Sequence, residues 1–243
     1  MTHSGDGHIF KRFDKEMHHL HSLVMRMGQL AVSQLREAVA TLQERAVDKA
    51  RRVIKNDKKI NDLDIEANDE IIRIIALRQP MARDLREIIA VSKIIAELER
   101  AGDEARKIAG LTIRFYADGE KAPVEHILRD IYALAGYVET MLGAVIGAFD
   151  DLDLDEALAV LAQGLELDDQ LQSILRRLTA FVMEDSRNVS HFVDIVLGVR
   201  ALERFGGHAK NIAGHIVFIK HGTDVRHEGV ESILRQLKGA GEG

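Results

Sequence analysis

A 13-residue stretch with the pattern of a helix end occurs twice in this sequence. The stretch LERAGDEARKIAG, residues 98–110, returns almost intact 104 positions later as LERFGGHAKNIAG, residues 202–214. Upstream, INDLD (60–64) pairs with DDQLQ (168–172) at an offset of 108, so the duplication extends over much of the chain. Two similar halves with long helices and short connections favour a pair of helix bundles over a longer solenoid array. The sequence therefore predicts two tandem, pseudo-symmetric units.

Apolar residues recur every three or four positions between the breaks, which is the period of helices with one buried face. Aromatic residues make up only 5% of the chain and Trp is absent, which favours helices over sheets. Pro80 and Pro123 each lie where a helix could begin. We expect six main helices, at 10–45, 48–77, 81–116, 123–149, 154–183 and 187–220, and a short seventh helix at 225–238.

The expected fold class is all-α, with two tandem pseudo-symmetric three-helix bundles. The first unit is expected over residues 1–118 and the second over 119–222, followed by a short C-terminal helix and tail over 223–243. With 243 residues and 46% hydrophobic content, the chain is long enough to bury a substantial core.

Composition excludes several function classes. The chain has no cysteine, which excludes disulfides, thiolate catalysis and Cys-ligated metal sites. A formal net charge of −6 argues against a dedicated nucleic-acid binder. The N-terminus lacks a signal-peptide pattern. Uncharged apolar runs such as Thr140 to Phe149 reach about half of the roughly 20 residues that a membrane helix needs, so we expect a soluble protein without membrane insertion.

The repeated helix end carries acidic residues beside its apolar seam. Glu99 and Asp103 stand four residues apart and so share one helix face, where like charges repel unless a cation compensates them. Hard divalent or trivalent cations prefer oxygen ligands, so the pair could form half of a metal site. Arg100, Arg106 and Lys107 are the alternative compensators, as a salt-bridge network. The second copy keeps Glu203 but has Gly207 where the first has Asp103.

The chain resembles the PhoU family of phosphate-signalling regulators over nearly its whole length. The most specific stretches are ALRQPMARDLREIIAVSKIIAELERAGD and VRALERFGGHAKNIAGHIVFIKHG, supported by FDKEMHHLHSLVMRMGQLA and VIKNDKKINDLD. The resemblance implies a cytoplasmic and often homodimeric negative regulator of the phosphate-starvation response. It implies contacts with the ATPase of a phosphate ABC transporter and with a membrane sensor histidine kinase, so that the protein reaches the membrane only through its partners.

The resemblance also implies a metal ion, such as Mg, Mn, Fe or Zn, at a Glu-x-x-x-Asp motif in each repeat. Its ligands here would be Glu99 and Asp103 in the first repeat and Glu203 in the second. Three further candidates are Asp57, Asp169 and His208. Gly207 replaces the motif's Asp, and Lys107 replaces the Asn that usually follows the motif, so each site departs once from the family pattern and metal binding stays open at both.

Two other readings of the sequence remain alongside a metal-binding regulator. A metal-independent helical scaffold that binds partners would explain the repeats and the charges equally well. A carboxylate-bridged di-metal enzyme needs two Glu-x-x-His motifs, and only Glu16 with His19 fits, so we expect no enzymatic activity. By resemblance of PMARDLR to the family, Arg83, Arg86 and Glu87 are expected near the partner contact.

Overall fold

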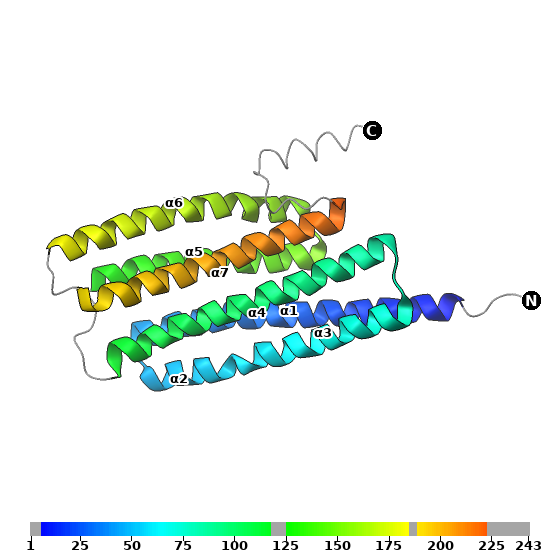
Figure 1. Ribbon diagram of the computed structural model, residues 1–243, viewed down its shortest axis with the longest axis horizontal. Coiled ribbons are helices and arrows are strands. Elements are labelled where there is room, and N and C mark those ends of the chain that lie inside the picture. The colour runs from blue at the N-terminus through cyan, green and yellow to red at the C-terminus, as the bar shows by residue number, and fades with distance from the viewer. Residues whose placement is uncertain (1–5, 118–124, 185–188, 223–243) are drawn as a thin grey trace, which may run out of the picture.

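The computed structural model describes residues 6–117, 125–184 and 189–222, and every secondary-structure element in these ranges is a helix (Figure 1). The first repeat contains α1 to α4 and the second contains α5 to α7, which confirms the predicted fold class of two three-helix bundles. The helices are α1 (Asp6–Glu44), α2 (Val47–Asn56), α3 (Lys58–Arg78), α4 (Ala82–Tyr116), α5 (Glu125–Asp151), α6 (Leu154–Glu184) and α7 (Val189–His221). The predicted boundary at 118/119 and the predicted helix at 225–238 lie outside the described residues.

The second predicted helix, 48–77, is interrupted at one residue. Asp57 separates α2 from α3 although its own backbone is right-handed helical, with φ −50° and ψ −32°. Its carbonyl accepts a bond of the tighter i to i+3 kind from the amide of Ile60, at 3.0 Å. Prediction of one uninterrupted helix was therefore wrong here, because side-chain periodicity does not register a locally tightened turn.

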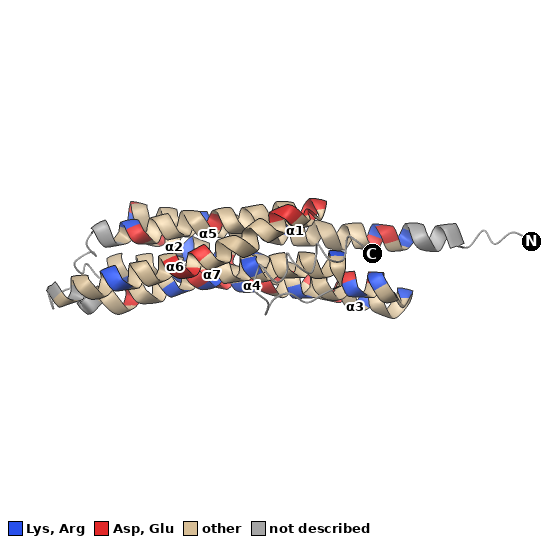
Figure 2. Ribbon diagram, turned by 90° about the horizontal axis from the view of Figure 1, so that it is seen from above, with Lys and Arg blue, Asp and Glu red and all other residues tan. Residues whose placement is uncertain are grey.

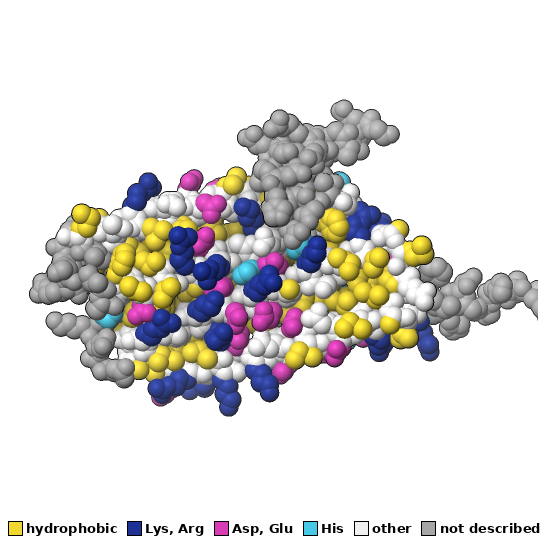
Figure 3. Space-filling view, viewed as in Figure 1, with side chains coloured by type: hydrophobic (Ala, Val, Ile, Leu, Met, Phe, Trp, Pro, Cys, Tyr) yellow, Lys and Arg dark blue, Asp and Glu magenta, His cyan; other side chains and the backbone are white. Residues whose placement is uncertain are grey.

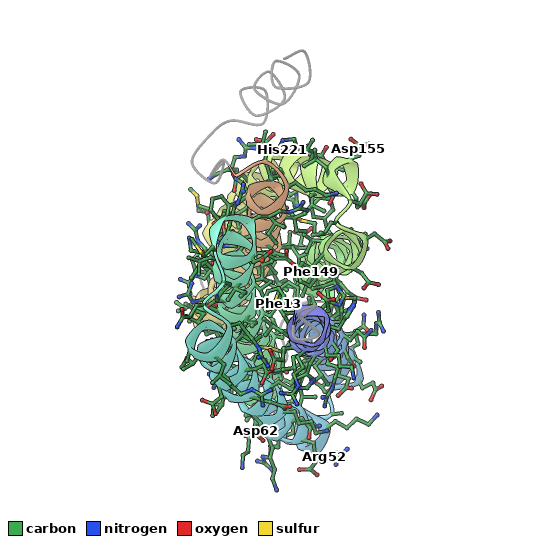
Figure 4. All side chains as sticks on the ribbon, turned by 90° about the vertical axis from the view of Figure 1, so that its right-hand side faces the viewer. Phe13, Arg52, Asp62, Phe149, Asp155 and His221 are labelled. Atoms are coloured by element: carbon green, nitrogen blue, oxygen red, sulfur yellow. The ribbon has the colours of Figure 1, made fainter. Side chains whose placement is uncertain are left out.

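Helices α4 and α7 form the central antiparallel pair. Arg114 of α4 contacts Asp194 near the start of α7, at 2.7 Å, and the last turn of α7 lies beside the first turns of α4. The two copies of the repeated helix end therefore face each other at the middle of the molecule. Figure 2 shows α1 and α5 in a second layer, and the end-on view of Figure 4 shows side chains filling the space between the layers.

Close packing against two glycines fixes how the repeats correspond. A Cβ at Gly102 would collide with Ile60, and a Cβ at Gly206 would collide with Leu167. Ile60 and Leu167 are 107 residues apart, so the sequence pairing at 108 was one residue out of register. One residue turns a helix by about 100°, so the correction changes which residues share a face. Asp57 corresponds to Gly164.

Helix α5 is the most apolar of the described helices by one test. Its stretch Leu128–Asp151 is long and apolar enough to cross a membrane by length and composition, although its uncharged run from Thr140 to Phe149 is too short to predict this. Half of its most apolar window is buried inside the bundle, where α5 packs against α1, α6 and α7. A core helix of a soluble protein passes the same test, so this stretch is weak support for a membrane span.

Candidate functional site

Four carboxylates gather between α3 and α4 in the first repeat, and we call them the acidic cluster: Asp57, Asp64, Glu99 and Asp103. The guanidinium of Arg106 connects two of them, with Nε 3.2 Å from an oxygen of Asp57 and Nη2 2.8 Å from an oxygen of Asp103. Asp57 is buried at the junction of α2 and α3. Its other oxygen accepts a hydrogen bond of 2.8 Å from the Gln34 amide, which also donates to the carbonyl of Gly102.

Glu99 is the member of this cluster whose pKa is raised by all three of the others. Partial burial raises the pKa of its carboxyl, and the neighbouring charges of Asp103, Asp64 and Asp57 raise that pKa further. Arg100 lowers the pKa only as the smallest contribution. The cluster therefore has more negative charge than its arginine neutralises, and a bound cation would relieve that excess.

The donor chemistry of the first repeat suits a hard cation, but the cluster is arranged around Arg106. Among the described residues no three His, Asp or Glu side chains converge closely enough to hold an ion. Arg106 rather than Lys107 compensates Asp103, because Lys107 instead donates to Glu104 at 2.7 Å. The predicted ligands Glu99, Asp103 and Asp57 thus share one neighbourhood, with an arginine between two of them.

The second repeat does not reproduce the cluster. Gly164 stands in place of Asp57 and Gly207 in place of Asp103, and Lys210, the counterpart of Arg106, lays its aliphatic chain against Gly164. Glu203 is paired with Arg200 at 3.0 Å. Asp169 is exposed on α6, five residues beyond Gly164. The residues present here do not form an oxygen-donor set for a metal ion.

His208 points away from the second motif and across the central helix pair. Its Nδ1 lies 2.6 Å from an oxygen of Glu97 on α4, and the Asn211 amide donates to the same oxygen at 3.2 Å. Burial acts to raise the pKa of Glu97, but these two hydrogen bonds and nearby positive charge outweigh it, so the pKa lies below its ordinary value. Glu97, His208 and Asn211 form what we call the inter-repeat network.

A second buried carboxylate lies one heptad along α4. Glu104 is 7% exposed, bonds to Lys107, and has a more distant contact of 3.9 Å with Arg204 of α7. Reading the sequence did not single out Glu97 or Glu104. Their seven-residue spacing on a face that also carries apolar seam residues was the available signal, because charged residues at such positions require partners from the facing helix.

The predicted partner residues lie at the beginning of α4. Arg83 is exposed, whereas Arg86 is partly buried beside Gly222 at the end of α7. Glu87 is also partly buried, and burial raises its pKa while Arg83 and His21 lower it. These three residues therefore do not form one uniform exposed face.

The fold and the duplicated motif define an all-α class of proteins built from two tandem three-helix repeats. The PhoU domain model matches residues 24–112 and again residues 131–216. This chain belongs to the PhoU family.

Relatives are similar over nearly the full chain. A phosphate-specific transport system accessory protein PhoU homolog of Pseudomonas putida is 35% identical over 232 residues, covering 96% of this chain and 90% of the relative. The phosphate-specific transport system accessory protein PhoU of Escherichia coli is 34% identical over 234 residues, covering 96% and 95%.

Two solved structures resemble this one. The crystal structure of PhoU from Pseudomonas aeruginosa has a TM-score of 0.82 and 34% identity, and the match covers 87% of this chain and 100% of that chain. The phosphate transport system regulatory protein PhoU from Streptococcus pneumoniae has a TM-score of 0.79, with coverage of 88% and 99%; at 22% identity it supports the fold alone.

Proposed function

We propose that this protein regulates phosphate uptake as an accessory component of a phosphate transport system. The observation that carries this proposal is similarity along nearly the whole chain to relatives whose names state that role. Both copies of the family domain are present, so the proposal concerns the complete two-repeat unit.

In finer terms, the protein is proposed to restrain the phosphate-starvation response in the cytoplasm. It would do so as an adaptor between the ATPase of a phosphate ABC transporter and a sensor histidine kinase, and as a homodimer. Exposed apolar side chains at both ends of the molecule support an adaptor role, because separate surfaces let one chain contact two partners. Figure 3 shows these groups at either end of one face, with a charged band between them.

Deletion of the gene tests the regulatory role. With the gene deleted, a phosphate-starvation reporter should become active in phosphate-rich medium, and the wild-type gene supplied in trans should repress it again. A reporter that stays repressed in the deletion strain would contradict the regulator and leave a scaffold with another task.

Charge reversal at the start of α4 tests the partner contact. Arg83→Glu/Arg86→Glu should weaken co-purification of the ATPase or the kinase at least tenfold, because rim charges steer and orient association. Arg51→Glu/Arg52→Glu on the exposed face of α2 is the matched control and should leave co-purification unchanged. If both variants co-purify the ATPase and the kinase equally well, Arg83 and Arg86 are not part of the partner contact.

Metal binding, in this proposal, belongs to the first repeat alone. Asp57, Glu99 and Asp103 would supply the oxygen donors after Arg106 moves out from between Asp57 and Asp103 and the three carboxylates draw together. A bound Mg, Mn, Fe or Zn ion would then supply the charge compensation that Arg106 provides in the structure. Elemental analysis of untagged protein should find metal in the wild type and none in Glu99→Ala/Asp103→Ala.

A single Gly207→Asp change should add no metal, because Gly164 leaves the second repeat without a counterpart of Asp57 as well. A stoichiometric gain from Gly207→Asp would show that one carboxylate was all that the second repeat lacked. Absence of metal from the wild type would favour the metal-independent regulator over the metal-binding one.

A further inference from the structure

Exposed apolar side chains cluster on the hairpin of α3 and α4, and we call them the α3–α4 strip: Ile65, Ile72, Met81, Leu85 and Ile89. Their exposed fractions run from 38% for Leu85 to 78% for Met81. Because α3 and α4 run antiparallel from a short turn, Ile72 and Ile89 lie at about the same level. Figure 3 shows apolar side chains gathered over this end of the molecule. Exposed apolar patches of this kind mark interaction surfaces.

The main chain leaves α7 beside this strip. Gly222 follows the last residue of α7 with φ +79°, a left-handed conformation that favours glycine and ends the helix. It lies so close to Arg86 that a Cβ there would collide with the guanidinium. One turn earlier, the ammonium of Lys93 lies 5.8 Å from the ring centre of Phe218. The chain beyond residue 222 therefore starts beside Arg86, in the same first turns of α4 that carry Leu85 and Ile89.

The 21 residues that follow, 223–243, contain apolar residues at helical spacing that could cover the α3–α4 strip. Val230, Ile233, Leu234 and Leu237 are spaced i, i+3, i+4 and i+7, which predicts one apolar face on a helix. A helix over 225–238 would be about 21 Å long, at about 1.5 Å per residue. Ile65 and Ile72 are about 10 Å apart along α3 by the same measure, so four turns suffice to cover the strip.

Charges are complementary in the direction that this connection imposes. The first half of the segment contains three acidic residues, Asp224, Glu228 and Glu231, against one arginine, Arg226, and it begins beside Arg86. Its second half contains Arg235 and Lys238, and the exposed face of α3 presents Asp69 and Asp62. A helix that starts over α4 and crosses toward α3 would place opposite charges together at both ends.

We propose that residues 225–238 form an amphipathic helix that packs on the α3–α4 strip of the same chain. Covalent attachment gives the segment an effective concentration on the order of millimolar, which a second copy or a free partner must exceed to take its place. If the proposed function is right, the docked segment competes with the partner that contacts Arg83; that consequence rests on the proposed function, whereas the docking itself does not.

Because the chain has no cysteine, paired substitutions give a clean cross-linking test. Ile89→Cys/Leu234→Cys should form an intramolecular disulfide at least tenfold faster than either of two controls in dilute purified protein. Ile89→Cys/Ser232→Cys moves the second thiol to the opposite face of the predicted helix. Val193→Cys/Leu234→Cys moves the first thiol to an exposed apolar position of the second repeat.

Equal rates in the three variants would overturn the proposal. A disulfide that forms only between copies, at a rate that rises with protein concentration, would also overturn it and would identify a second copy as the occupant. Both results are obtained without transporter or kinase, so failure of docking is distinguishable from failure of the regulatory role.

Hydrogen exchange provides a test that needs no cysteine. In the full-length variant Ile233→Asp/Leu237→Asp, the amides of residues 65–89 should exchange several-fold faster than in the wild type, because burial of the strip is lost. Glu228→Gln/Glu231→Gln should change them less, since it removes charge but keeps the apolar face. Unchanged exchange in the double aspartate variant would contradict docking.

Discussion

The two repeats share one packing frame but differ in what they bury. At four equivalent positions between the helices, the first repeat places hydrogen-bonded polar side chains, whereas the second places two glycines, a methionine and a lysine whose aliphatic chain lies against one of the glycines. The first repeat holds Gln34, Asp57, Asp103 and Arg106 where the second holds Met141, Gly164, Gly207 and Lys210.

This difference shows that the bundle itself does not require the acidic cluster. Leu167 packs against Gly206 just as Ile60 packs against Gly102, although the carboxylates are gone from the second repeat. Buried polar groups stabilise little by themselves and are costly when a partner is missing. Their presence in the first repeat alone therefore indicates a role specific to that repeat. The following substitutions measure how much the polar groups of each repeat contribute to stability.

Glu97→Ala should have the largest effect, because it gives α4 the residue that α7 has at the equivalent position, Ala201. The change removes the acceptor shared by His208 and Asn211 across the central helix pair. We expect a loss of about 2 to 4 kcal/mol in the free energy of unfolding, measured by urea denaturation. Glu203→Ala is the control on the solvent side of α7 and should cost less than about 0.5 kcal/mol.

The lowered pKa of Glu97 predicts that the stability contributed by the inter-repeat network depends on pH. The folded-state pKa of Glu97 is lowered, so its contribution is fully present above the unfolded-state pKa and is lost as the pH falls through the folded-state value. The stability difference between wild type and Glu97→Ala should therefore shrink in acid. A difference that stays constant from pH 7 to pH 3 would mean that packing, not charge, carries it.

Asp57→Ala should have the next largest effect. Gln34 and Arg106 would both lose an acceptor, and Gln34 is buried. We expect a loss of about 1 to 3 kcal/mol by denaturant titration. Gly164→Ala makes the second repeat identical to this variant at the matched position and should stay within about 1 kcal/mol of the wild type, since a better helix former offsets displacement of Lys210. Equal losses from both would erase the proposed difference between the repeats.

Gly164→Asp should move the second repeat toward the first by a smaller amount. The new carboxylate would lie beside Lys210, as Asp57 lies beside Arg106. Higher helix propensity and one ion pair together should raise stability by about 0.5 to 1 kcal/mol. In a Lys210→Met background the gain should fall by about half, which a double-mutant cycle measures. A loss of stability in both backgrounds would show that this site has no room for the side chain.

Glu99→Gln should have the smallest effect, and it should stabilise. The folded-state pKa of Glu99 is raised, so the ionised form is disfavoured, and the penalty develops as the pH rises from the unfolded-state pKa through the folded-state value. In metal-free protein at pH 7 we expect Tm to increase by roughly 1 °C, a modest value because solvent screens a partly exposed group. The gain should vanish near pH 3. Glu203→Gln, which loses its Arg200 partner, should not raise Tm.

Helix periodicity and the internal duplication were sufficient to predict the fold, because both depend on repeated burial of one face. The site was harder to predict from the sequence. The offset of 108 pairs Asp169 with Asn61, whereas the offset of 107 pairs it with Asp62, an exposed residue of α3, and pairs Asp57 with Gly164. Lys107 was considered as the partner of Asp103, but its neighbour Arg106 lies on the correct face. The hydrogen bonds of Glu97 could not be predicted from the sequence, because its partners are more than 100 residues away and reach it only when α7 packs against α4.

The central pairing of α4 with α7 also determines how late during synthesis α4 can complete its packing. Helix α7, the partner of α4 in the central pair, is the last of the described helices to be synthesised, and its end at His221 comes 105 residues after the end of α4 at Tyr116. Synthesis adds roughly 5 to 20 residues per second, so the apolar face of α4 that packs on α7 stays exposed in the nascent chain for about 5 to 20 seconds. During that interval a nascent chain could pair with the same face of a neighbouring chain on the same message. Ribosome spacing and chaperone supply should therefore affect the yield of correctly folded protein.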